Sequence, residues 1–169
     1  MSLAFIFPGQ GSQAVGMGAE LTEAFASARE VFQEVDEALG ESLSRLVREG
    51  PIETLTLTQN AQPALMAVSV AIQRTLEREF GIPVEKASFV AGHSLGEYSA
   101  LCAAGALTLT DTARLLRRRG EAMQRAVPVG EGAMAALIGP KSDVALAEAA
   151  AAAGAEVGVC TVANDNNAG

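Results

Sequence analysis

A single serine stands between two glycines in the segment Gly92-His93-Ser94-Leu95-Gly96, which matches the G-x-S-x-G pattern of acyl-transferring serines. A serine hydroxyl is a poor nucleophile unless a sharp strand-to-helix turn projects it clear of its own backbone and within reach of a base. Glycines two residues to either side allow such a turn, because no Cβ keeps the strand and the helix apart. The pattern also arises by chance in a chain with 17 glycines. The apolar run before it and the helical composition after it favour a nucleophile.

Two backbone amides are candidates for an oxyanion hole, the pair of donors that stabilises a tetrahedral intermediate. The amide of Leu95 opens the helix that follows the serine, where the helix dipole strengthens it. The second donor must come from another loop, and the amide of Gln10, in the glycine-rich turn over 8–13, is the best candidate. On spacing alone, an ordinary turn explains that segment equally well.

Strands and helices alternate along the first part of the chain. Apolar runs over 3–7 and 87–91 predict strands, the second of them buried on both faces. Apolar spacing and stop signals predict helices over 21–39, 42–49, 62–80, 95–104 and from 110 to about 125, with Thr58 and Thr110-Asp111 as caps. This alternation indicates an α/β fold with a parallel sheet, whose reactive groups lie at the carboxyl ends of the strands. Ser94 and the 8–13 turn both fall there.

A proline- and glycine-rich segment over 128–132 predicts a boundary between a larger unit, 1–127, and a smaller one, 128–169. After it the pattern restarts as a strand over 133–138, a helix over 142–153 and a strand over 157–162. One strand-helix-strand unit leaves an unpaired edge and an uncovered apolar face. The smaller unit is therefore expected to be incomplete.

Composition narrows the class of protein. The 169 residues are 49% hydrophobic and carry 12 basic and 20 acidic side chains, a net charge of −8, which argues against binding to nucleic acid or an anionic membrane. The uncharged stretch over 54–73 contains a proline and several amides, so a buried helix explains it better than a membrane span. No export signal is evident, and we expect a cytoplasmic protein with Cys102 and Cys160 reduced. A single histidine and unclustered cysteines predict no metal site.

Taken together, the motifs closely resemble those of the malonyl-CoA:acyl-carrier-protein transacylases of fatty acid synthesis. The resemblance rests on Phe7-Pro8-Gly9-Gln10-Gly11-Ser12-Gln13, Gln62-Pro63-Ala64-Leu65, residues 92–100, Arg119-Gly120, Met123-Gln124, Gly132-Ala133-Met134-Ala135-Ala136 and Ala163-Asn164-Asp165-Asn166, in the same order. It implies a hydrolase-like parallel sheet with a nucleophile elbow plus a small ferredoxin-like subdomain, both incomplete in this chain. It also implies malonyl-CoA and acyl carrier protein as partners. No cofactor is implied, since the coenzyme A thioester and phosphopantetheine are substrates.

The resemblance assigns a role to each matched position. Ser94 would accept the malonyl group as an ester, and the amides of Gln10 and Leu95 would form the oxyanion hole. Arg119 would hold the malonyl carboxylate, a role that suits the two parallel donors of a guanidinium. The cleft-lining positions would be Gln62, Asn164 and Asn166.

Arg119 belongs to a cluster of arginines, and a single arginine in such a cluster is more often part of a solvated helix face. The other members are Arg114, Arg117, Arg118 and Arg125. Acyl carrier protein and the phosphates of coenzyme A are negative, so these arginines form a candidate docking face, with 117 and 118 as the positions to test.

The base that should activate Ser94 is missing. The only histidine is its neighbour His93, and neighbours at such an elbow point apart. The resemblance places the catalytic histidine in a later segment, beyond residue 169. The chain is therefore expected to be the amino-terminal part of the enzyme. Four alternatives stay open: an inert fragment that needs the rest of the protein, a second chain carrying the remainder, a serine esterase of the α/β-hydrolase type, and an acyltransferase module of a polyketide synthase. Met1 directly before the first strand favours a freestanding enzyme over a polyketide synthase module.

Overall fold

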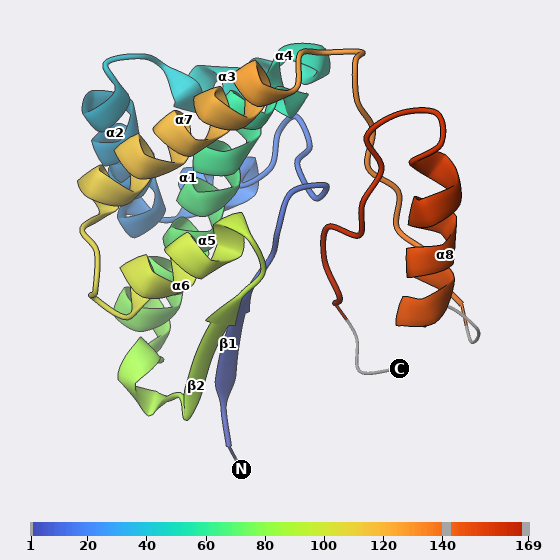
Figure 1. Cartoon of the computed structure of the whole chain (residues 1–169). Coiled ribbons are helices and arrows are strands. Elements are labelled where there is room, and N and C mark those ends of the chain that lie inside the picture. Colours follow the sequence, from blue (N-terminus) through green and yellow to red (C-terminus); the bar gives the residue numbers. More distant parts are fainter. Residues whose placement is uncertain (1, 140–142, 167–169) are drawn as a thin grey trace. The chain divides into compact units, whose positions relative to one another are not determined.

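The structure is a computed structural model that describes residues 2–139 and 143–166 (Figure 1). It contains two compact units, Met1–Val129 and Gly130–Gly169. The first holds both strands and all but one of the helices found in the described residues. The predicted α/β class is confirmed.

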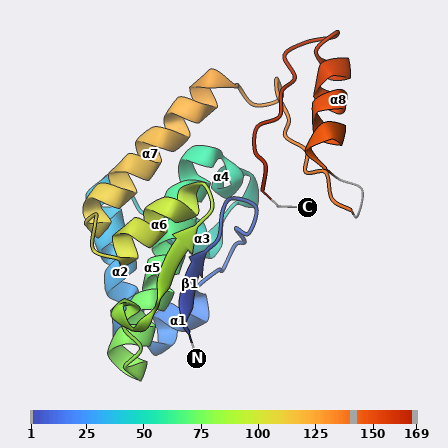
Figure 2. The ribbon, with the colours of Figure 1, turned by 60° about the horizontal axis from the view of Figure 1, so that its bottom comes forward.

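A two-stranded parallel sheet lies directly before the turn that carries Ser94. Strand β1 (Ala4–Phe7) pairs with β2 (Phe89–Gly92), with Ala4 opposite Phe89 and Phe7 opposite Gly92. Helix α6 (Leu95–Ala103) packs against both strands (Figure 2). Only one face is covered by helices of this unit, because Ile6 and Phe89 on the other face are 78% and 71% exposed. The prediction that the 87–91 strand is buried on both faces is therefore wrong for this chain.

The region predicted as one helix over 21–39 forms two. Helix α1 (Ala19–Ala24) ends where Phe25 adopts an extended conformation, and α2 (Ala26–Leu39) follows at once. The ring of Phe25 meets that of Phe80 edge to face, with the centroids 5.9 Å apart. This aromatic contact accompanies the break between the two helices. The apolar periodicity of the sequence does not indicate that break.

Helix α5 is the central helix of the first unit. It spans Thr58–Phe80 and therefore begins four residues before the predicted start at Gln62. Leu57, not Thr58, is the N-cap residue, so the predicted cap is wrong. Short helices α3 (Leu43–Glu49) and α4 (Ile52–Thr56) precede it, and a turn of 3-10 helix, η1 (Val84–Lys86), follows.

The last helix of the unit is α7 (Leu109–Ala126). Its cap is Thr108 rather than the predicted Thr110-Asp111: the hydroxyl of Thr108 accepts from the amide of Asp111 at 3.0 Å and donates to its carboxylate at 2.8 Å. Helix α7 packs along α5 and α2, as Figure 1 shows. The hydrophobic core lies mainly among these three helices and includes Val31, Val35, Leu65, Met66, Val70, Leu95, Ala113 and Leu116.

The second unit contains helix α8 (Val144–Gly154), which confirms the predicted helix except at Ser142, which lies outside the described residues. Neither 133–138 nor 157–162 forms a strand. A strand requires a hydrogen-bonded neighbour, and Ile138 and Val157 are 90% and 93% exposed. An apolar pattern alone therefore does not predict a strand in these two segments. The ferredoxin-like assignment of this unit stays a prediction.

Candidate functional site

Ser94 occupies a sharp turn between β2 and α6. It is the N-cap residue of α6, with φ 55° and ψ −113°, and it is the one residue other than glycine with positive φ among those the structure describes. A Cβ on Gly92 would lie 2.0 Å from the carbonyl oxygen of Gly96, and one on Gly96 would lie 2.3 Å from that of Phe7. Both positions therefore require glycine. The turn has the form expected of a nucleophile elbow.

Arg119 reaches the serine from α7. Its Nη2 donates to Ser94 Oγ at 3.0 Å, and its Nη1 donates to Gln62 Oε1 at 2.5 Å. The guanidinium carbon lies 5.8 Å from the centre of the Tyr98 ring, within the range of a cation–π contact. The structure thus brings together three predicted site residues that are far apart in sequence, Ser94, Arg119 and Gln62.

Gln62 is fully buried on α5. Its Nε2 donates to Thr58 Oγ1 at 2.8 Å and lies 3.3 Å from Met123 Sδ. Helices α5 and α7 approach closely here because residue 120 is glycine: a Cβ at Gly120 would lie 2.4 Å from Gln59 Cα. This close approach allows Arg119 to reach Gln62.

Gln10 is tied to the same group of side chains. The hydroxyl of Thr58 donates to Gln10 Oε1 at 2.9 Å. The predicted oxyanion donors are backbone amides, and that of Leu95 opens α6, where a helix leaves its first amides without intrahelical acceptors. The roles of Gln10 and Leu95 stay predictions.

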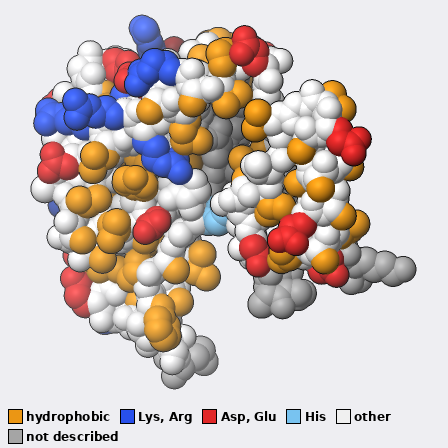
Figure 3. Space-filling model, in the orientation of Figure 1, with side chains coloured by type: hydrophobic (Ala, Val, Ile, Leu, Met, Phe, Trp, Pro, Cys, Tyr) orange, Lys and Arg blue, Asp and Glu red, His pale blue; other side chains and the backbone are white. Residues whose placement is uncertain are grey.

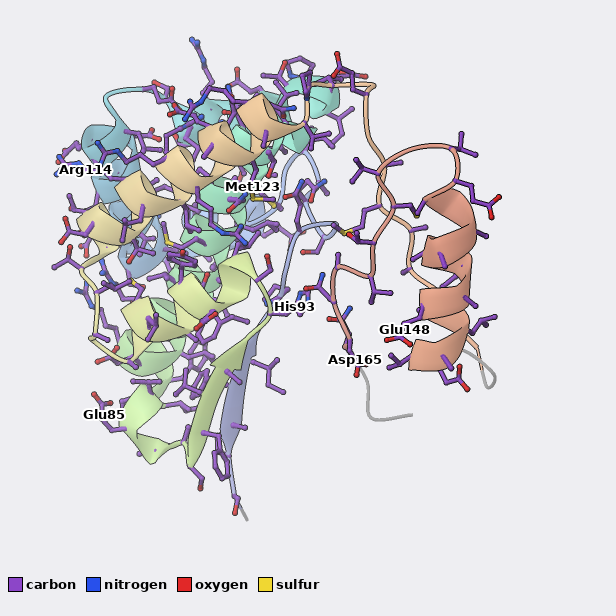
Figure 4. The ribbon with its side chains drawn as sticks, in the orientation of Figure 1. Glu85, His93, Arg114, Met123, Glu148 and Asp165 are labelled. Carbon is purple, nitrogen blue, oxygen red and sulfur yellow. The ribbon has the colours of Figure 1, made fainter. Side chains whose placement is uncertain are left out.

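His93 lies at the carboxyl end of β2, beside the 8–13 turn (Figure 4). Its amide donates to the carbonyl of Phe7 at 3.4 Å, and a Cβ on Gly9 would lie 3.0 Å from its Nδ1. The imidazole therefore packs against the turn that carries Gln10.

Asn164 and Asn166 lie in the segment after α8, in the second unit. The first unit by itself assembles Ser94, Arg119 and Gln62 and links Gln10 to them. The two asparagines stay predicted cleft-lining positions.

Sequence reasoning missed Thr58 and Met123 as neighbours of the site. Each stands one helical turn from a residue that was identified, at 58 and 62 on α5 and at 119 and 123 on α7. Residues four apart on a helix share a face. The four-residue spacing between Thr58 and Gln62 would have identified Thr58, but the helix was predicted to begin only at Gln62.

Comparison with known proteins decides the family. The family model described as "Acyl transferase domain" matches residues 4–167. The chain belongs to this acyl transferase family. The predicted resemblance is confirmed.

The relatives of this acyl transferase chain are named for malonyl transfer. The malonyl CoA-acyl carrier protein transacylase of Bacillus subtilis strain 168 is 56% identical over 81% of the chain and 42% of its own length. The crystal structure of the acyl-carrier-protein-S-malonyltransferase from Bartonella henselae is 63% identical, with a TM-score of 0.90 over 99% of the chain and 52% of its own. A malonyl-transacylase in complex with its type II PKS acyl-carrier protein is 47% identical, with a TM-score of 0.71 over 76% of the chain and 40% of its own. The chain spans about half the length of the relatives it matches.

The arginine cluster of the acyl transferase chain divides into bound and exposed members. Arg117 donates to Asn60 Oδ1 and pairs with Glu41, and its side chain is 14% exposed. Burial lowers its pKa, although the nearby Glu121 raises it. Arg114 is exposed and donates to the carbonyl of Ala38, and Arg118 and Arg125 are exposed as well. Figure 3 shows basic side chains gathered on the side where α7 lies.

Two further findings concern metal sites and membrane-spanning helices, neither of which the sequence predicts. Within residues 2–139 and 143–166, no group of three or more His, Cys, Asp and Glu side chains is arranged to hold a metal ion. In the same part of the chain, no helix combines the length and the apolar character that crossing a bilayer requires.

Proposed function

We propose that the protein carrying this chain transfers a malonyl group from coenzyme A to the phosphopantetheine thiol of an acyl carrier protein, through an ester on Ser94. The observation that carries the proposal is the hydrogen bond from Arg119 to Ser94 Oγ at the elbow. It puts a group that pairs with carboxylates within reach of an acyl group on that oxygen. The names of the relatives, and the complex of one of them with an acyl carrier protein, support the same substrates.

The reaction would proceed in two halves. Ser94 Oγ attacks the thioester carbonyl carbon, the carbon–sulfur bond breaks, and coenzyme A leaves as a thiol that takes up the serine proton. The carrier-protein thiol then attacks the ester carbonyl, the carbon–oxygen bond breaks, and Ser94 recovers a proton. In both halves the amides of Gln10 and Leu95 would hold the oxyanion, aided by the positive end of α6.

Arg119 would select the acyl group. Gln62 already fixes one of its nitrogens, and the other contacts Ser94 Oγ, so an ester on that oxygen brings the malonyl carboxylate to a guanidinium held in place. An acetyl group has no carboxylate and would leave this cation unpaired in the site. Positioning before the reaction lowers the entropic cost of the contact.

The base would come from a part of the protein outside this chain, since His93 is the only histidine in the sequence and packs against the 8–13 turn. We accordingly propose that the 169-residue chain alone is inactive. We also propose that the protein is cytoplasmic and works without a resident cofactor, because a serine, a base, two amides and an arginine suffice for acyl transfer.

Docking of the acyl carrier protein is proposed at the exposed part of the arginine cluster. Arg117 is engaged by Asn60 and Glu41, so charge reversal there would disturb the fold as well as any docking. Arg118 is exposed and is the better test position. Arg118→Glu should raise KM for the carrier protein while leaving KM for malonyl-CoA unchanged. An equal effect on both would place Arg118 outside the docking face.

The selectivity of ester formation tests the proposed function. Arg119→Ala should slow malonyl-Ser94 formation by about 100-fold, because hydrogen bonds to charged groups contribute about 1.5–3 kcal/mol each. The same variant should react with acetyl-CoA at or above the rate of the unsubstituted protein. Arg45→Ala, at an exposed position of α3 outside the arginine cluster, is the matched control. If Arg119→Ala kept its preference for malonyl, Arg119 would not be the carboxylate group.

The remaining alternatives differ in the substrate and in the polypeptide required. A serine esterase would prefer p-nitrophenyl acetate to malonyl-CoA, and the comparisons favour the transacylase over it. Turnover of malonyl-CoA by the 169-residue polypeptide, verified by mass, would refute the proposal that the chain alone is inactive.

A further inference from the structure

We propose that Thr58 is a positioning residue that joins the two halves of the Ser94 site, the Gln10 loop and the Arg119 guanidinium, through its single hydroxyl. This inference rests on the proposed function. It assigns a role to a residue that the sequence pattern predicts only as a helix cap.

A continuous polar chain runs through this hydroxyl. From one end to the other it consists of Ser94, Arg119, Gln62, Thr58 and Gln10. Its hydrogen bonds measure 3.0, 2.5, 2.8 and 2.9 Å in that order. Its members come from the elbow, α7, α5 and the 8–13 turn, so it connects four separate elements.

The arginine sets the direction of the first three bonds, and the placement of Gln10 Oε1 sets that of the fourth. A guanidinium only donates, so Gln62 must present Oε1 to Arg119 and its Nε2 to Thr58. The hydroxyl of Thr58 accepts that bond, and its own proton is then available for Gln10 Oε1. Residue 58 must therefore accept and donate at once, which serine and threonine can do and valine cannot.

Loss of the hydroxyl should affect both halves of the site. Gln62 is fully buried, so without Thr58 Oγ1 its Nε2 retains, among the residues that the structure describes, only the weak acceptor Met123 Sδ. The amide then no longer holds one orientation toward Arg119. Gln10 loses the bond that fixes its side chain, and with it the position of the proposed oxyanion amide. The first effect concerns only malonyl, whereas the second concerns every acyl group.

The experiment measures ester formation on Ser94 with malonyl-CoA and acetyl-CoA in the full-length protein, by acid quench and intact mass. Thr58→Val should slow acetyl transfer about fivefold and malonyl transfer about 25-fold, since each lost hydrogen bond is equivalent to about a 2- to 10-fold change. Thr58→Ser should recover most of both rates. Thr56→Val, an exposed threonine of α4, is the matched control.

A residue that only stabilised the fold would not change the ratio of the two rates in this way. Equal rates for Thr58→Val and the unsubstituted protein, an unchanged malonyl-to-acetyl ratio, or a Thr58→Ser variant as impaired as Thr58→Val would each overturn the inference. Should Thr58→Val not fold, Thr58→Ala carries the same expectation, and failure of both to fold would place the role of Thr58 in stability instead.

A measurement without substrate separates this inference from the proposed function. The effects of Gln10→Ala and Arg119→Ala on melting temperature should be non-additive with threonine at 58 and additive in Thr58→Val. Additivity in both backgrounds would overturn the inference even if malonyl-Ser94 forms. Coupling without any malonyl ester would refute the proposed function and leave only the structural coupling through Thr58 in place.

Discussion

The backbone of Ser94 should carry measurable strain, and two pairs of substitutions can isolate it. Ser94 has φ 55° and ψ −113°, a region that residues with a Cβ rarely adopt. Holding such a conformation costs about 1–3 kcal/mol, and glycine escapes the cost. Ser94→Gly should therefore be more stable than Ser94→Ala, although glycine normally weakens a fold.

A helix N-cap favours glycine over alanine for other reasons, so the comparison needs a reference site. Ser42 provides one: it is the N-cap of α3, makes no side-chain cap hydrogen bond, as is also true of Ser94, and has φ −87°. Subtracting the glycine–alanine difference at 42 from that at 94 removes the common entropic and capping contributions. The remainder should be about 1–3 kcal/mol in favour of glycine at 94.

Urea denaturation of the four variants supplies the free energies of unfolding, provided that the m-values agree. Both changes at 94 remove the hydroxyl that accepts from Arg119, so this loss also cancels. Glycine–alanine differences at 42 and 94 that agree within about 0.5 kcal/mol would show that the elbow is not strained.

Three other outcomes follow from packing and burial. Gly120→Ala should lower the free energy of unfolding by about 1–3 kcal/mol in urea, because its Cβ would lie 2.4 Å from Gln59 Cα, whereas helix propensity alone would raise it by about 1 kcal/mol. Arg117→Met should cost about 1–3 kcal/mol by the same measurement, and Arg118→Met should stay within about 0.5 kcal/mol; equal costs would contradict the division of the arginine cluster. Burial raises the pKa of the Cys102 thiol, so iodoacetamide should modify the exposed Cys160 first, as mass spectrometry would show. Because the thiol of the unfolded chain ionises at lower pH than the folded one, Cys102 costs the fold stability as pH rises through the alkaline range. Cys102→Ala should therefore reduce the fall in the free energy of unfolding over that range, measured in urea.

Local patterns in the sequence were enough to predict the elements that position the serine. Short apolar runs, turn residues and a strong apolar period mark the two strands, the turn at Ser94 and the long helices, although the pairing of the two strands joins distant segments. The break at Phe25 coincides with a contact to a distant side chain, Phe80, which no local pattern in the sequence indicates. The strands predicted over 133–138 and 157–162 failed for a related reason, since pairing depends on neighbours that periodicity does not supply.

The site was predictable where residue type determines chemistry. A guanidinium and a serine hydroxyl were expected near one acyl group, and the structure places them 3.0 Å apart. Thr58 could not be found in this way, because its contribution arises from accepting a bond from Gln62 on its own helix and donating one to Gln10 in the 8–13 turn. Arg117 shows the opposite case, since its sequence context suggested an exposed docking residue and its contacts with Asn60 and Glu41 make it part of the fold.

If Ser94 carries the malonyl group, that group can be located directly on the chain. The full-length protein is mixed with malonyl-CoA, quenched in acid and digested with trypsin, which cuts after Lys86 and Arg114 and releases residues 87–114 with the serine inside. We expect one malonyl group on this peptide, assigned to Ser94 by fragmentation and missing from Ser94→Ala. A malonyl group on another residue, or one that persists in Ser94→Ala, would contradict this expectation.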